Sequence, residues 1–177
     1  MRSFVLVLVL ALTTLSQTSP AQAQDPACSP QAIEVRDATI GGSLVLGAYA
    51  TSGFLGALAD EFNHGNLPAI RVRAQAAGQS GAISAQLQQL DALLGSGTLN
   101  PADVTVLQRL RDLFVTLKAE ADALVAYASS RDKAQAAAFR ENRKKAWEEL
   151  VKLMGFEPAV AEVAAPGGAM LGMPEGH

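Results

Sequence analysis

The feature that most constrains the fold is a regular spacing of apolar residues between positions 107 and 128. They recur at alternating steps of three and four, at Leu107, Leu110, Phe114, Leu117, Ala121, Leu124 and Ala128. This heptad spacing places the side chains along one side of an α-helix, where another helix must cover them to exclude water. The segment therefore predicts a long helix within a bundle.

Two more helices are expected before this one. The first runs from Thr39 to about His64 and ends at Gly65. Its expected inner stripe contains apolar or small residues at helical spacing, at Ile40, Leu44, Gly47, Thr51, Phe54, Leu58 and Phe62. The second begins near Pro68 and ends at the glycines after Leu94. A kink or break is expected at residues 78–81, because the apolar phase changes there and each of two glycines costs about 1 kcal/mol against alanine. Before these glycines the apolar residues at helical spacing are Leu67, Ile70, Ala74 and Ala77. After them the apolar residues are Ile83, Leu87, Leu90 and Leu94, which lie on a different side of the same helix.

The helix that carries the heptads has a clear start, with Asn100 as its cap and Pro101 in the first position. A fourth helix is expected to begin at Ser129 or Ser130, where Ser129 and Asp132 resemble a capping box, and to end at Gly155. Its expected inner residues are Phe139, Ala146, Leu150 and Leu153. The alternative is one continuous rod, since residues 129–133 contain no glycine or proline.

The chain shows no strand-like alternation of apolar and polar residues. It is therefore predicted to be all-α, an antiparallel up-down four-helix bundle over residues 39–156. A polar lead-in over residues 24–38 precedes the bundle, and a flexible tail over residues 157–177 follows it, because that segment is rich in glycine, proline and small residues.

Residues 1–23 have the organisation of a signal peptide. Arg2 supplies the positive charge, a short apolar run extends from Phe4 to Leu12, and Ala21 and Ala23 are the small residues that a signal peptidase reads. The run is shorter than the roughly 20 residues that span a bilayer. The protein is therefore expected to be exported to the periplasm or the extracellular space after cleavage near Ala23.

Residues 38–59 carry no charge, which raises the alternative of a membrane-associated helix. Polar Thr51 and Ser52 dilute its hydrophobicity, and Asp60 and Glu61 follow it instead of basic anchors. These features favour a bundle helix that its neighbours bury on several sides.

Composition narrows the function classes. With 49% hydrophobic residues and a net charge of −3, the chain lacks the basic excess of a nucleic-acid-binding protein. It contains no nucleophile elbow and no phosphate-binding loop, and its only histidines are His64 and His177. The sequence therefore predicts a non-enzymatic protein without a cofactor, which acts by protein–protein interaction or by self-association.

Two further features are candidates for binding. The basic cluster Arg140, Arg143, Lys144 and Lys145 suits an anionic partner, but acidic residues four positions away favour a solvated, locally neutral face. Cys28 is the single cysteine, and in an oxidising compartment it either bridges two chains or remains a free thiol.

Copper handling is the alternative function. Met170, Met173 and His177 near the C-terminus offer thioether and imidazole ligands of the kind that Cu(I) prefers. An unstructured tail rich in alanine, glycine and methionine is the simpler interpretation. Asp60 and His64 are four residues apart, and two ligands do not make a metal site.

Overall fold

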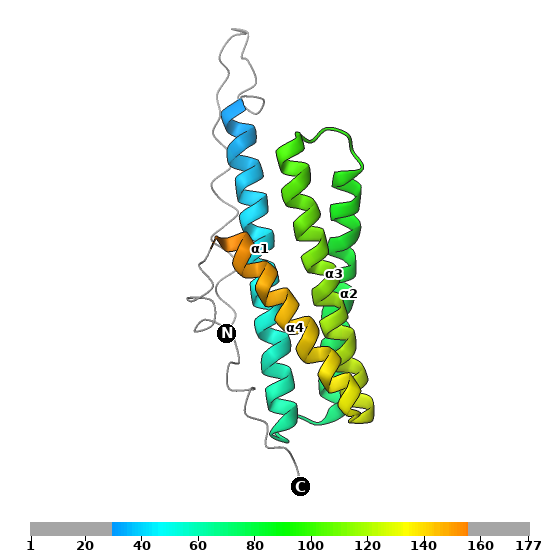
Figure 1. The fold of residues 1–177 in the computed structure, drawn as a ribbon. Helices are drawn as coiled ribbons and strands as arrows, with labels where there is room; N and C mark the ends of the chain where they lie inside the picture. The colour runs from blue at the N-terminus through cyan, green and yellow to red at the C-terminus, as the bar shows by residue number, and fades with distance from the viewer. Residues whose placement is uncertain (1–29, 156–177) are drawn as a thin grey trace, which may run out of the picture. The chain divides into compact units, whose positions relative to one another are not determined.

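The structure is a computed structural model, and the residues described from it are 30–155 (Figure 1). Four helices occupy this range: α1 (Pro30–Asn63), α2 (Ala69–Leu94), α3 (Pro101–Ser130) and α4 (Lys133–Met154). No strand occurs between residues 30 and 155. The prediction of an all-α four-helix bundle is confirmed, while the predicted signal peptide (1–23) and tail (157–177) lie outside the described residues.

The start of α1 differs from the prediction. The helix begins at Pro30 instead of Thr39, so it takes in much of the expected lead-in over residues 24–38. The chain divides into two units between Asp37 and Ala38, and the second unit contains the bundle.

Polar contacts show the direction of α2 relative to α3. Asp91 near the end of α2 pairs with Arg111 in the first half of α3, and Ser80, earlier in α2, donates to Asp122 further along α3. The two helices therefore run in opposite directions. In the same way, α3 and α4 are antiparallel, and α4 crosses α3 obliquely in Figure 1. The up-down order of all four helices remains the expectation from the short connections.

The heptad residues of α3 form the centre of the core. All of those predicted are buried, at Leu107, Leu110, Phe114, Leu117, Ala121, Leu124 and Ala128. They join buried residues of the other three helices in one cluster, including Leu55 and Phe62 of α1, Ile83 of α2 and Leu150 of α4. Helix α3 is therefore the element around which the others pack.

The predicted start of α3 is confirmed. The Asn100 side chain accepts a hydrogen bond from the backbone N–H of Asp103 at 2.9 Å, and Pro101 is the first helical residue. The cap satisfies one of the N–H groups that a helix start leaves without a partner.

The predicted start of α4 is wrong, and so is the continuous rod. Arg131 adopts a left-handed conformation with φ 57°, which ends α3. Asp132 then caps α4 by accepting from the backbone N–H of Ala134 at 2.7 Å. Ser129 and Ser130 are the last residues of α3, and their hydroxyls donate back to the carbonyls of Val125 and Ala126. At the other end, Gly155 caps α4 as predicted.

Helix α2 continues through residues 78–81 without the expected break. The predicted apolar face of the first half of α2 is wrong, because Ile70 is 63% exposed. The buried stripe instead runs in register along Val72, Ala76, Ser80, Ile83 and Leu90. Its one polar member is satisfied, because the Ser80 hydroxyl donates to Asp122 at 2.6 Å.

The inner face of α1 also differs from the prediction. Leu58 and Phe62 are buried as expected, but Phe54 is 38% exposed. The buried positions are Ala48, Ser52, Leu55, Gly56, Leu58, Ala59 and Phe62. Part of the uncharged segment of α1 therefore faces outward.

Candidate functional site

The most unusual surface of the bundle is the outward side of α1. Leu46 is 67% exposed, Tyr49 39% and Phe54 38%. Ala50 and Ala57 are also exposed, and Gly53 is half-buried between them. These six residues, which we call the α1 face, lie along one side of the helix because each is three or four positions from another member of the set.

The α1 face belongs to a segment without charges. Residues 38–59 contain no Asp, Glu, Lys or Arg. The span Gly41–Asn63 is long and apolar enough to cross a membrane, with mean hydropathy 1.3, and only 33% of its most apolar window is buried. The bundle therefore covers only part of α1, which is less burial than the sequence led us to expect.

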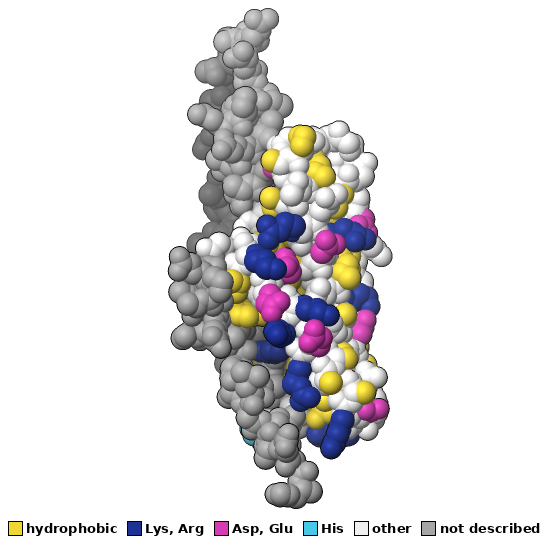
Figure 2. Space-filling view, in the orientation of Figure 1, with side chains coloured by type: hydrophobic (Ala, Val, Ile, Leu, Met, Phe, Trp, Pro, Cys, Tyr) yellow, Lys and Arg dark blue, Asp and Glu magenta, His cyan; other side chains and the backbone are white. Residues whose placement is uncertain are grey.

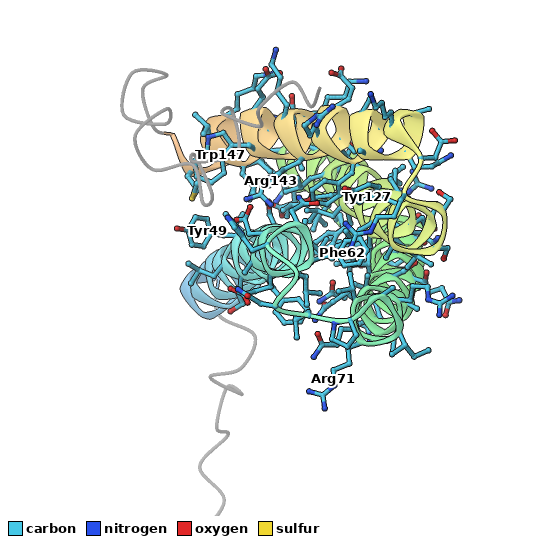
Figure 3. All side chains as sticks on the ribbon, turned by 90° about the horizontal axis from the view of Figure 1, so that it is seen from below. Tyr49, Phe62, Arg71, Tyr127, Arg143 and Trp147 are labelled. Atoms are coloured by element: carbon cyan, nitrogen blue, oxygen red, sulfur yellow. The ribbon has the colours of Figure 1, made fainter. Side chains whose placement is uncertain are left out.

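One flank of the α1 face borders α4. The rings of Tyr49 and Trp147 lie 6.0 Å apart between centroids. One turn earlier on α4, Arg143 extends toward α1, whereas Arg71 of α2 extends away from the bundle (Figure 3). Tyr49 therefore lies at the boundary between the α1 face and the contact with α4.

The guanidinium of Arg143 also lies near a buried carboxyl group on α3. Its Nη1 lies 3.9 Å from Oε1 of Glu120, whose side chain is 0% exposed. Neither carboxyl oxygen of Glu120 has a hydrogen-bond partner among the described residues. Burial raises the pKa of Glu120 to about 8, and the nearby Arg143 opposes part of that rise.

Gly56 of α1 makes room for this arrangement. A Cβ atom at this position would lie 1.7 Å from Nη1 of Arg143, far inside van der Waals contact. The guanidinium therefore packs directly on the α1 backbone, and the three residues Gly56, Glu120 and Arg143 link three helices at one point.

The basic cluster predicted on α4 does not form one surface. Arg143 is 14% exposed and faces inward, whereas Lys144 and Lys145 are exposed. Both lysines pair with acids on the same helix, Lys144 with Glu148 and Lys145 with Glu141. Figure 2 shows basic and acidic side chains interleaved on this side of the bundle. The face is locally neutral, as expected for its exposed part.

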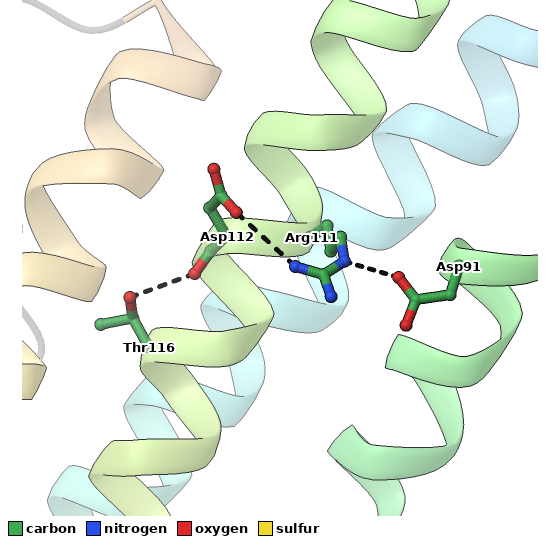
Figure 4. A network of polar contacts seen from close by, with 4 residues as sticks. All are labelled: Asp91, Arg111, Asp112 and Thr116. Atoms are coloured by element: carbon green, nitrogen blue, oxygen red, sulfur yellow. Dashed lines mark hydrogen bonds and ion pairs between the residues drawn. The ribbon is translucent and has the colours of Figure 1, made fainter. Parts of the chain in front are cut away.

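A second polar group lies between α2 and α3. The Nε of Arg111 donates to Asp91 at 2.5 Å, and its Nη1 lies 4.0 Å from Asp112, whose backbone carbonyl accepts from Thr116 (Figure 4). These side chains are exposed, with 40% for Arg111 and 52% for Asp91. An exposed network of this kind fixes helix register and contributes little stability.

The structure does not bring metal ligands together in the range it describes. No group of three His, Cys, Asp or Glu residues with suitable spacing occurs among residues 30–155. Nδ1 of His64 lies 2.8 Å from the backbone oxygen of Asp60, so the pair forms a helix-end contact. Met170, Met173, His177 and Cys28 lie outside the described residues.

Sequence reasoning missed Glu120 and Gly56. A signal for Glu120 was present, since it lies three residues after Leu117 and four before Leu124, in register with core residues. Glu120 also directly precedes Ala121 of the heptad seam, and a carboxylate that borders a buried seam needs a cation or a hydrogen-bond donor nearby.

Comparison of the chain with protein-family models, with curated proteins and with solved structures finds no match.

Proposed function

We propose that this protein is exported and acts by binding protein through the α1 face, without catalysis of its own. The exposed, uncharged stripe of Leu46, Tyr49 and Phe54 is the observation that carries the proposal. Removing apolar surface from water is favourable by about 25 cal/mol of free energy per Å². A contiguous apolar stripe on an otherwise charged bundle is typical of an interaction site.

Residues 1–23 support export. Their positive, apolar and small-residue regions follow the order of a secretory signal, and cleavage near Ala23 leaves the bundle intact. The experiment is to determine the N-terminus of the protein recovered from the periplasmic fraction and from the culture medium. An N-terminus at Gln24 supports export, while a chain that retains Met1 inside the cell contradicts it.

Protein binding is tested by photocrosslinking in the producing cells. A photoreactive amino acid replaces Leu46 on the α1 face, and the control replaces Val106, which is 48% exposed on α3. We expect discrete protein adducts from position 46 and none from position 106. Equal adduct patterns from both positions, or no protein adduct from position 46, would contradict the proposal.

Membrane association is the second candidate, and the length and hydropathy of Gly41–Asn63 favour it. The inner side of α1 supplies Leu55, Leu58 and Phe62 to the core, so a spanning α1 would expose the apolar residues that it now covers. A helix lying along the bilayer surface is the form compatible with the bundle.

Liposome flotation distinguishes the two candidates. The mature protein is mixed with vesicles of neutral and of anionic lipids and centrifuged through a density gradient. Protein that remains in the dense fraction supports protein binding. Flotation that a Leu46→Glu substitution abolishes would support the membrane candidate instead.

A further inference from the structure

We infer that the occupant of the α1 face is a second copy of this chain, with the two α1 helices packed antiparallel. This inference rests on the proposed function, since it names the partner for the same surface. It would give a two-fold symmetric dimer in which each copy contributes the same residues.

The first argument is electrostatic. The α1 face lies within residues 38–59, which contain no charged side chain. An uncharged surface meets its own copy without like-charge repulsion, whereas a charged partner would lose hydration without a counter-charge. Most other exposed helix surfaces of the bundle carry Lys, Arg, Asp or Glu, and those surfaces do not match the α1 face.

The second argument is the order of large and small residues. Leu46, Ala50, Gly53 and Ala57 follow steps of four, three and four, which is the spacing of a heptad seam. In an antiparallel pair centred between Ala50 and Gly53, Leu46 of each copy lies opposite Ala57 of the other. A parallel pair would instead place Leu46 against Leu46 and Gly53 against Gly53, which leaves a gap in the middle.

The small central residues suit close approach of two helices. Ala50 and Gly53 bring no long side chain to the contact, so the two backbones can come near each other. Tyr49 and Phe54 lie on the two flanks of the seam and keep more than a third of their surface exposed in one copy. They are therefore in place to cover the edges of the contact.

The size of the contact indicates a weak dimer. At about 1.5 Å per residue, the seam from Leu46 to Ala57 is about 17 Å long. A contact about 17 Å long and about 10 Å wide, which is the width of one helix, is well below the range of about 1,200–2,000 Å² that is typical of stable complexes. We therefore expect an equilibrium between monomer and dimer that shifts with protein concentration.

Cysteine crosslinking tests the arrangement in the mature chain with Cys28→Ser. In the antiparallel pair, the two copies of position 50 are offset by about 4.5 Å along the axis, and those of position 46 by about 16 Å. We expect A50C to form a disulfide dimer on mild oxidation, since Cα atoms within about 7 Å can be bridged. L46C by itself is expected to stay monomeric, while a mixture of L46C and A57C forms the mixed dimer.

Three outcomes would overturn the inference. The first is a self-dimer of L46C as efficient as that of A50C, which would indicate a parallel pair. The second is the absence of a disulfide dimer from A50C. The third is an equal yield of dimer from the control V106C on α3. Circular dichroism of each variant checks that it folds. Photocrosslinking of position 46 to a different protein would remove the dimer and leave the proposed function standing, whereas no protein adduct at all would remove both.

Discussion

The guanidinium of Arg143 lies 3.9 Å from the fully buried carboxyl group of Glu120, at the point where α3, α4 and α1 meet. Neither oxygen of Glu120 has a hydrogen bond within the described part of the chain, so the cation is the main group that favours its ionised form. Because few groups stabilise the ionised form of this buried carboxyl group, the free energy of unfolding is expected to depend on pH.

The first prediction concerns that pH dependence. The pKa of Glu120 is about 8 in the folded protein against an ordinary value of 4.5 for a glutamate in water, so the folded state binds more protons between these values. The contribution to stability is complete below pH 4.5 and is lost as the pH rises toward 8. At about 1.4 kcal/mol per pKa unit, the loss is at most about 5 kcal/mol.

Glu120→Gln removes this titration while keeping the size of the side chain. Its free energy of unfolding should match that of the wild type near pH 5 and exceed it at pH 8. Urea unfolding at several pH values measures both, with the exposed Glu141→Gln as the control. A constant difference between Glu120→Gln and the wild type across this range would contradict the prediction.

The second prediction concerns Gly56. Gly56→Ala should destabilise the bundle by about 1–3 kcal/mol, because the new methyl group occupies the position of the Arg143 guanidinium. Gly81→Ala in α2 is the matched control, since a Cβ there meets nothing within 4 Å. That change should stabilise by up to about 1 kcal/mol through helix propensity.

A double-mutant cycle identifies the cause. When Arg143→Ala is already present, Gly56→Ala should lose most of its cost, because the clashing group is gone. Chemical denaturation of the four proteins gives the coupling energy. Additive effects of the two substitutions would show that Arg143 is not the group that Gly56 accommodates.

The third prediction concerns the boundary between α3 and α4. Asp132→Ala should cost about 1 kcal/mol, because it removes the acceptor for the backbone N–H of Ala134. Ser129→Ala should cost less, since its hydroxyl donates within α3 and caps nothing. Thermal unfolding of both variants provides the measurement, and equal losses would favour a capping role for Ser129.

The fourth prediction concerns association. Leu46→Glu places a charge on the α1 face at a side chain that is 67% exposed. The free energy of unfolding of the monomer should change by less than about 0.5 kcal/mol, as is usual for surface positions. Sedimentation equilibrium should show a dimer in the wild type that is lost in Leu46→Glu and retained in Val106→Glu. Equal association of all three proteins would contradict this role of Leu46.

Much of the local structure is determined by the sequence itself. The heptad spacing from Leu107 to Ala128 predicts α3 and its buried side, and Asn100 and Gly155 mark helix ends where the structure has them. These signals are short-range: a capping side chain bonds within three residues, and the helical period puts neighbours in register over one turn. They therefore do not depend on what the rest of the chain does.

The tertiary structure decided which sides of the helices are covered. In α2, both the stripe containing Ile70 and the one containing Val72 have helical spacing, and only packing against α3 selects the second. In α1, the uncharged segment is compatible with burial all round, yet the bundle leaves Leu46 and Phe54 in solvent. In the sequence, Arg143 is part of a basic run. In the structure its side chain lies inside the bundle, because Gly56 of α1 and Glu120 of α3, which are distant in sequence, form its surroundings. Burial depends on contacts between such distant segments, and a periodicity along one helix contains no information about them.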